Sequence, residues 1–370
     1  MTATAPAVTL PNLNAVPFAR GYIEHLMPLD WKFALGGWEY TRTPNRIFRP
    51  RGLFVTGWML LPDGPFEKIA AYVNGQEFFT CVPQVRPDLS SAFPHVPNAD
   101  KAGFTFKIPS AVARRGRLMM VGRRKGQPVG KMLMHFRDDL PWIVPTPPPD
   151  LTDRVVGTRK AYFFLAQGYK SFGEIKDAVA RHRPLHEIRR ILDWGCGPGR
   201  LTAHWLRRKE KFEVHGCDID PQHIAWCGSN LRRGQFARVD FTPPTLYPDA
   251  HFDAVFGYSV FTHLTREAQH LWLAEIRRIL TPGGVFVATV QGPSAAWFVF
   301  GDKSRDMLAT GIHDGTVDPG MEAVVGEGAY RSTYQTPEWT RETFGHYFDV
   351  LEYAERAIGN NQDLIVLRRR

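Results

Sequence analysis

Short apolar runs alternate with helical patterns along the C-terminal half of the chain. Runs of this length with few polar residues are typical of buried parallel strands. They cover residues 190–194, 213–218, 235–241, 252–258, 285–290, 348–353 and 362–367. Strands that alternate with helices in this way predict an α/β domain, which we place at residues 151–370.

The helical patterns lie before, between and after these strands. Apolar residues recur at helical spacing over 159–183, 264–280 and 337–347, so that each segment has one face that can pack against a sheet. We expect the second of these helices to stop at Thr281-Pro282-Gly283-Gly284, because proline and glycine interrupt helices. Residues 291–336 are glycine-rich and are predicted to be an irregular insertion that shapes an acceptor pocket.

The N-terminal half has a different sequence pattern, which predicts short strands and turns. Residues 69–73 and 76–79 flank Asn74-Gly75, which is a strong signal for a two-residue hairpin loop. Further strands are predicted at 52–60, 103–108 and 117–122. No long helical pattern interrupts them, so residues 18–140 are predicted to form a smaller, mostly β domain that is sandwich-like.

Proline-rich segments precede and join the two predicted domains. Residues 1–17 contain prolines among small and polar residues and are expected to be a flexible arm. Residues 141–150 are also rich in proline and are predicted to be a stiff, extended linker. We therefore place the domain boundary in this linker.

Composition and charge exclude several classes of protein. The 370-residue chain has a formal net charge of +9 and a sequence pI of about 9.4. Its basic residues form short, scattered clusters outside any recognised nucleic-acid module, so nucleic acid is not the expected partner, although the net charge leaves RNA as an alternative. Four cysteines without a C-x-x-C pair indicate neither a disulfide scaffold nor a metal site. No apolar stretch is long enough for a membrane helix and no signal peptide is evident, so a soluble, cytoplasmic protein is expected.

The most informative stretch is Asp193-Trp194-Gly195-Cys196-Gly197-Pro198-Gly199, at the end of the first predicted strand of the α/β domain. Its glycines permit a tight turn and leave bare backbone beside the start of the next helix, where a ligand can bind. The spacing does not fit the dinucleotide fingerprint G-x-G-x-x-G, because position 200 is arginine. The sequence also lacks the G-x-x-x-x-G-K-[ST] phosphate-binding loop.

The pattern D-x-G-x-G-x-G resembles the first motif of class I S-adenosylmethionine-dependent methyltransferases. The resemblance extends over 190–370 and includes a Leu-x-Pro-Gly-Gly segment at 280–284. It implies a Rossmann-like, seven-stranded methyltransferase domain that uses S-adenosyl-L-methionine and releases S-adenosyl-L-homocysteine. It also implies that residues of the glycine loop contact the cofactor, namely Asp193, Gly195, Cys196, Gly197 and Gly199.

The second strand of this domain ends at Asp218, to which the resemblance assigns the ribose of the cofactor. A carboxylate there can accept hydrogen bonds from both ribose hydroxyls, and Ile219 would pack on the adenine. Asp220 precedes Pro221 and is expected to cap the next helix rather than to bind a ligand.

The third and fourth strands supply the remaining predicted cofactor contacts. Asp240 would accept from the adenine amino group, with the alternative that it is an ordinary loop acid, and Phe241 would offer its backbone or its ring. Tyr258 would line the pocket. Amino-methyltransferases of DNA carry an Asn/Asp-Pro-Pro-Tyr box after the fourth strand, whereas this chain has Gly257-Tyr258-Ser259-Val260, so methylation of a nucleobase amino group by that mechanism is not expected.

In the reaction that the resemblance implies, an acceptor attacks the cofactor's methyl group in line, and the protein holds the two together. A general base helps when the acceptor is an alcohol. His263, just after the fourth strand, is the candidate base, with the alternative that it caps or braces the following helix. The candidate acceptor contacts within the insertion are His313, Tyr330, Arg331 and Tyr334.

The segment from Arg86 to Pro94, followed by Gly103-Phe104, resembles a β-sandwich module that accompanies bacterial glycan enzymes. The alternative is that Arg86 and Asp88 only brace a long loop. With the resemblance, we expect O-methylation of a sugar or related group in a bacterial surface glycan or glycolipid precursor. The other options are a small-molecule or natural-product methyltransferase and a non-catalytic glycan-binding or assembly protein. The oligomeric state is left open, and a homo-oligomer is one option.

Overall fold

The computed structural model describes residues 20–28, 52–73, 75–109, 115–137, 144–208, 210, 212–318, 322–326, 330–359 and 361–370. The chain divides into two compact units, Met1–Pro141 and Trp142–Arg370. The arm expected at 1–17 lies outside the described residues. Among the helices that are described, none is long and apolar enough to cross a membrane.

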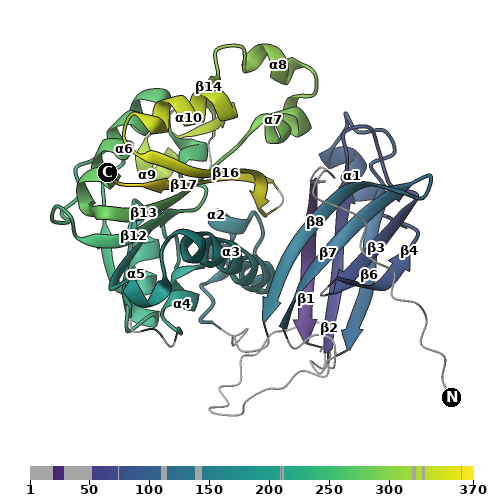
Figure 1. Ribbon diagram of the computed structural model, residues 1–370, viewed down its shortest axis with the longest axis horizontal. Coiled ribbons are helices and arrows are strands. Elements are labelled where there is room, and N and C mark those ends of the chain that lie inside the picture. The colour runs from purple at the N-terminus through teal and green to yellow at the C-terminus, as the bar shows by residue number, and fades with distance from the viewer. Residues whose placement is uncertain are drawn as a thin grey trace. The chain divides into compact units, whose positions relative to one another are not determined.

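The first unit contains two four-stranded antiparallel sheets, with strand orders β1-β2-β6-β5 and β4-β3-β7-β8 (Figure 1). The strands are β1 (Arg20–Pro28), β2 (Gly52–Leu60), β3 (Lys68–Val73), β4 (Gln76–Cys81), β5 (Gln84–Val85), β6 (Lys101–Pro109), β7 (Arg115–Arg124) and β8 (Gln127–Arg137). The Phe79 ring of β4 stacks on the Phe106 ring of β6 with their centroids 5.1 Å apart. Aromatic side chains therefore pack between the two sheets.

Two local predictions for the first unit can be compared with this structure. Strands β3 and β4 pair as a hairpin in which Val73 lies opposite Gln76, which confirms the predicted strand pairing; Asn74 lies outside the described residues. The Arg86 guanidinium donates to both oxygens of Asp88, at 2.9 and 2.6 Å, across the start of α1 (Pro87–Ala92). This bidentate pair is the geometry expected if the two residues brace the segment.

The second unit is built on a seven-stranded sheet in the order β11-β10-β9-β12-β13-β17-β16 (Figure 1). Its strands are β9 (Arg190–Trp194), β10 (Glu213–Asp218), β11 (Gln235–Arg238), β12 (Phe252–Gly257), β13 (Leu280–Val290), β16 (Asp349–Ile358) and β17 (Gln362–Arg368). The first five are parallel, and β17 runs antiparallel to both β13 and β16. The predicted α/β, Rossmann-like fold of this half is confirmed.

The order of the strands reverses beside β9. This strand pairs with β10 on one side and with β12 on the other, because the chain first builds the sheet outward to β11 and then returns to the centre. In open α/β sheets, ligands bind outside the carboxyl ends of the strands at such a reversal. The glycine loop leaves β9 at this point.

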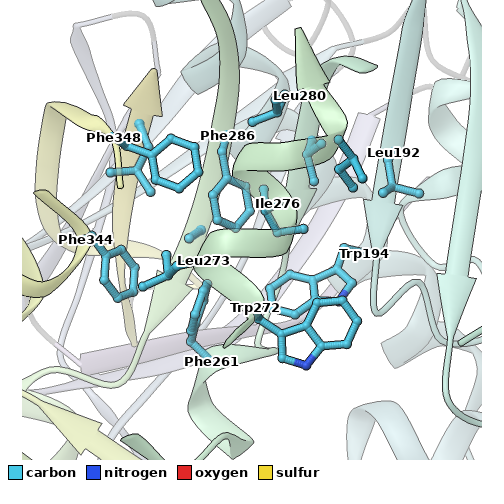
Figure 2. Packing of buried hydrophobic residues seen from close by; sticks show 14 of the residues in the cluster. Leu192, Trp194, Phe261, Trp272, Leu273, Ile276, Leu280, Phe286, Phe344 and Phe348 are labelled. Carbon is cyan, nitrogen blue, oxygen red and sulfur yellow. The ribbon is translucent and has the colours of Figure 1, made fainter. Parts of the chain in front are cut away.

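Helices pack against this sheet through large apolar side chains. They include α3 (Ala161–His182), α4 (Thr202–Trp205), α5 (Pro221–Asn230), α6 (Arg266–Ile279) and α10 (Pro337–Gly345). Figure 2 shows Trp272 and Ile276 of α6 packed with Trp194 of β9 and Phe286 of β13 in one buried cluster. The rings of Trp194 and Trp272 are 4.9 Å apart, and burying each such side chain contributes roughly 2–3 kcal/mol. This packing holds the end of β9 in place.

The structure corrects the predicted boundary between the fifth strand and the helix before it. Strand β13 begins at Leu280, so the Thr281–Gly284 segment belongs to the strand instead of separating it from α6. The cause is pairing with the C-terminus, since the Gly283 amide donates to the Arg369 carbonyl and the Arg369 amide to the Gly284 carbonyl, both at 2.9 Å. Gly283 has a φ of +72°, which glycine adopts without strain.

The insertion at 291–336 was predicted to be irregular, and this was wrong. It contains α7 (Pro293–Phe300), α8 (Lys303–Met307), β14 (Ile312–Val317), α9 (Glu322–Val325) and β15 (Arg331–Gln335). Strands β14 and β15 form a two-stranded antiparallel sheet. A small core of Ala295, Ala296, Leu308 and Tyr334 supports these elements, and its apolar runs are too short to show a clear period in the sequence.

The linker prediction also needs correction at its end. Residues 144–148 form no helix or strand, but Pro149 and Asp150 begin α2 (Pro149–Val156). Proline is well suited to the first helical position, because its fixed φ fits the helix and its missing N–H has no partner there. The helix ends at Gly157, whose φ is +66°.

Candidate cofactor and active site

The glycine loop folds back on strand β10 through its backbone. Its three glycines all have positive φ, at +72° for Gly195, +53° for Gly197 and +75° for Gly199. The amides of Gly195 and Cys196 both donate to the Cys217 carbonyl, at 2.9 and 3.0 Å. A Cβ at Gly195 would lie only 2.5 Å from Cγ2 of Val260. Glycine is therefore required there both by conformation and by space.

Asp218 joins the end of β10 to this loop. Its Oδ2 accepts from the Gly197 amide at 2.7 Å, and its Oδ1 accepts from the Asp220 amide at 2.8 Å. Asp220 caps α5 as predicted, since its side chain accepts from the Gln222 amide at 2.8 Å. A carboxylate oxygen can accept two hydrogen bonds, so each oxygen of Asp218 has capacity for one more donor, such as a ligand hydroxyl.

Asp193 is buried near the end of β9, where the Thr202 hydroxyl donates to its Oδ2 at 2.5 Å. Burial, assisted by the negative charge of Asp218, raises the pKa of Asp193 to about 7 against the lowering effect of the Thr202 bond. The side chain thereby ties the strand to the first residue of α4.

A pocket lies at the carboxyl ends of β9, β10 and β12. Of the residues predicted to bind the cofactor, the pocket is lined by Asp193, Gly195, Cys196, Gly197, Asp218, Ile219, Phe241 and Tyr258. Gly199 is not among the lining residues, and a Cβ there would lie 2.4 Å from Cδ1 of Leu231, so this glycine serves the packing of the loop on α5.

Asp240 also lies off the pocket lining, and its side chain is exposed. The reason is the length of the third strand, since β11 ends at Arg238 and not at Phe241 as predicted. Phe241 is nevertheless held at the pocket wall, because Nε1 of Trp272 donates to its carbonyl at 3.0 Å.

His263 closes the one-turn helix η3 (Phe261–His263) and lines the same pocket. Its Nδ1 lies 2.9 Å from the Arg331 carbonyl and 3.6 Å from Oδ2 of Asp318. A carbonyl only accepts, so Nδ1 carries the proton and the lone pair of the neutral ring is on Nε2. Burial lowers the pKa of His263 below its ordinary 6.5, which keeps the ring neutral at pH 7. The alternative capping role is not seen, because Thr265 caps α6.

The insertion places Asp318, Tyr330 and the Arg331 carbonyl against His263. The Tyr330 ring stacks on the imidazole with centroids 4.2 Å apart and an interplanar angle of 10°. Of the four predicted acceptor residues, Tyr330 lines the pocket and the other three do not. Nε2 of His313 pairs with Oγ1 of Thr316 at 3.0 Å, Tyr334 is buried against Phe300, and Arg331 contributes its carbonyl to His263.

The family model and the curated relatives that match this chain are methyltransferases. A family model described as a methyltransferase domain matches residues 191–284. Malonyl-[acyl-carrier protein] O-methyltransferase of Halorhodospira halophila is 32% identical over 202 residues, covering 48% of this chain and 66% of that protein. Demethylmenaquinone methyltransferase of Deinococcus radiodurans is 32% identical over 134 residues, covering 35% and 53%. Fatty-acid O-methyltransferase of Mycolicibacterium smegmatis is 31% identical over 117 residues, covering 29% and 39%. The chain thus spans from about two fifths to just under two thirds of these relatives' lengths.

The C-terminal half contains a class I S-adenosylmethionine-dependent methyltransferase domain. The matched segment includes the glycine loop, Asp218 and His263, and the cofactor is S-adenosylmethionine. The pocket fits this cofactor, since Gly195 leaves the backbone bare and Asp218 offers lone pairs to hydroxyl donors.

Three ionisable residues that line the described pocket were not predicted from the sequence. Arg154 of α2 donates to Oδ2 of Asp220 at 2.6 Å, Arg200 holds its guanidinium 4.9 Å from the centroid of the Tyr258 ring, and His223 comes from α5. Arg200 directly follows the glycine loop, and this position is a signal that was available in the sequence. Arg154 belongs to α2, a helix that was not predicted because it begins within the proline-rich segment.

Proposed function

We propose that the protein transfers the methyl group of S-adenosylmethionine to a hydroxyl oxygen of a small-molecule acceptor, with His263 as the general base. The observation that carries this proposal is the hydrogen bond between Nδ1 of His263 and the Arg331 carbonyl, because it leaves the Nε2 lone pair to accept a proton. A small-molecule acceptor is supported by the relatives, which are named for malonyl-[acyl-carrier protein], demethylmenaquinone and fatty acid.

The cofactor supplies an activated methyl group and a good leaving group, so little covalent chemistry is left to the protein. The glycine loop and Asp218 bind and orient it. Nε2 of His263 would take the proton from the acceptor hydroxyl as its oxygen bonds to the methyl carbon, while the sulfur–methyl bond would break and S-adenosylhomocysteine would leave. Tyr330 covers one face of the imidazole and limits the access of water.

A carboxylate acceptor is a second candidate, favoured by two of the relatives. A fatty acid and a malonyl group each carry a carboxyl group, and the relatives named for them are O-methyltransferases. A carboxylate is already ionised at pH 7 and needs no base, so this candidate leaves the geometry of His263 without a role.

The sugar hydroxyl expected from the sequence is one case of the first candidate. We keep it as a prediction, with the N-terminal unit as a sandwich-like accessory domain and residues 151–370 as the catalytic domain. The relatives described above are not named for glycans, and a homo-oligomer likewise stays a prediction.

The test is to incubate the protein with methyl-labelled S-adenosylmethionine and fractions of a bacterial extract, and then to treat the labelled products with alkali. A methyl ether survives this treatment, whereas a methyl ester is hydrolysed. We expect alkali-stable label in a small-molecule fraction, and a much smaller yield from His263→Gln. Alkali-labile label that is formed equally by His263→Gln would replace the first candidate by the second.

A further inference from the structure

His223 is a pocket residue whose ring has no hydrogen-bond partner in the described part of the chain. It lies in the first turn of α5, two residues after Pro221 and three after the Asp220 cap. The residue is only 2% exposed, yet both Nδ1 and Nε2 are buried without a partner. A buried donor without a partner is unfavourable, so a ligand that supplies a partner gains binding free energy. The position of His223 on the pocket wall indicates where such a ligand lies.

The two acids nearest to His223, Asp218 and Asp220, determine which chemical group can bind beside its ring. Nδ1 of His223 is 3.6 Å from Oδ1 of Asp218 and 3.7 Å from Oδ2 of Asp220. Asp220 is already engaged by Arg154 and by its own cap, whereas Oδ1 of Asp218 accepts, among the described residues, from the Asp220 amide alone. A ligand group can therefore be received between His223 and Asp218, and not between His223 and Asp220.

The distance between Nδ1 of His223 and Oδ1 of Asp218 allows one hydroxyl oxygen to bridge them from the side. Two atoms 3.6 Å apart can each lie about 2.8 Å from one oxygen that is placed about 2.1 Å to the side of the line joining them. A hydroxyl is suited to this position because it donates and accepts at once, donating to the carboxylate and accepting from the imidazole N–H. The charge of Asp218 would repel a chloride or a carboxylate, and a protonated amine could not accept from the His223 N–H.

We propose that His223 and Asp218 together hold one ribose hydroxyl of S-adenosylmethionine, with Nδ1 of His223 donating to the hydroxyl oxygen and the hydroxyl donating to Oδ1 of Asp218. The sequence assigned the ribose to Asp218 alone. This inference rests on the cofactor of the proposed function, but it does not depend on the acceptor or on turnover.

His204 provides a matched comparison within the same domain. It is also buried, and its Nε2 also lacks a partner in the described structure. However, its ring stacks on Phe172, with centroids 5.2 Å apart, and it does not line the pocket. A partnerless histidine is therefore not enough for ligand binding, and the contact with Asp218 at the pocket wall distinguishes His223.

The test uses calorimetry with S-adenosylhomocysteine and its 2′-deoxy and 3′-deoxy analogues on the full-length protein. We expect His223→Leu to weaken binding of S-adenosylhomocysteine roughly tenfold, and His204→Leu to change it less than twofold. One of the two deoxy analogues should bind the wild type at least tenfold more weakly than S-adenosylhomocysteine. On His223→Leu, the difference in affinity between S-adenosylhomocysteine and this analogue should be much smaller, because the variant has already lost the imidazole N–H that donates to the hydroxyl.

A second variant covers the case in which His223→Leu does not fold. His223→Gln keeps an N–H donor, and it should retain part of the discrimination against that deoxy analogue. Equal discrimination by the wild type and by a folded His223 variant without a donor would overturn the inference while leaving the cofactor in place. A wild type that does not bind S-adenosylhomocysteine would overturn the cofactor assignment and this inference with it.

Discussion

The two walls of the pocket are built by different means. The wall around Gly195, Gly197 and Asp218 is made of backbone and of one carboxylate whose oxygens are already fixed by two amides. The wall around His263 is made of side chains, and its supports, Asp318, Tyr330 and the Arg331 carbonyl, come from the insertion.

This difference follows from where each wall lies in the fold. The first wall sits at the ends of paired parallel strands, where the sheet fixes the backbone and leaves little freedom. The second depends on a segment added after β13, which can vary without disturbing the sheet. We therefore expect changes in the first wall to affect cofactor affinity and changes in the second to affect turnover.

The largest effect is expected at Gly195. Gly195→Val should weaken binding of S-adenosylhomocysteine by more than about 100-fold, because the residue has φ of +72° and its Cβ would lie 2.5 Å from Cγ2 of Val260. Isothermal titration calorimetry measures the change. Gly228→Ala is the control, since a Cβ there meets nothing within 4 Å and α5 gains helix propensity. Tight binding by Gly195→Val would show that the loop does not form the cofactor wall.

The second largest effect concerns the other wall. His263→Gln should lower kcat by about 100-fold or more while the cofactor dissociation constant stays within about twofold, because the variant removes the base but no part of the cofactor wall. His313→Gln is the matched control, since His313 lies in the insertion hairpin that supports His263 but off the pocket lining. A parallel loss of cofactor affinity in His263→Gln would break the division between the two walls.

A smaller effect is expected at Asp218. Asp218→Asn should weaken cofactor binding by about tenfold or more, since an amide cannot accept from the Gly197 amide, the Asp220 amide and a ribose hydroxyl in the way that a carboxylate does. Asp240→Asn should change the affinity by less than about twofold, because Asp240 is exposed and off the pocket lining. If Asp240→Asn weakened cofactor binding more than Asp218→Asn, the result would support the adenine contact that the sequence predicts for Asp240.

The same division explains what could be predicted from the sequence. The strands, the glycine loop and Asp218 were foreseen because a buried parallel sheet leaves a pattern in neighbouring residues, and because Gly195 and Gly197 are needed at fixed spacing. The supports of His263 were not foreseen, since Asp318 and the Arg331 carbonyl are brought to it from 55 and 68 positions away by the pairing of β14 with β15. Backbone carbonyls leave no trace in a sequence, and short strands rarely show a period.

The smallest effect is expected at Asp318, and it sharpens the assignment of His263. Burial lowers the pKa of His263, whereas the Arg331 carbonyl and the negative charge of Asp318 raise it. The base acts when it is neutral, so kcat is full above this pKa and falls as the pH drops through it, which places the acidic limb of the profile below pH 6.5.

Asp318→Asn removes one of the raising contributions, so the limb should move to lower pH by a fraction of a pH unit, while kcat at pH 8 changes by less than about threefold. Asp314→Asn is the control from the same hairpin, because Asp314 accepts from the Arg266 amide at 2.8 Å and serves the start of α6. A pH profile of kcat for the two variants distinguishes these roles. A limb that moved to higher pH, or equally in both variants, would show that the group titrating in the profile is not His263 facing Asp318.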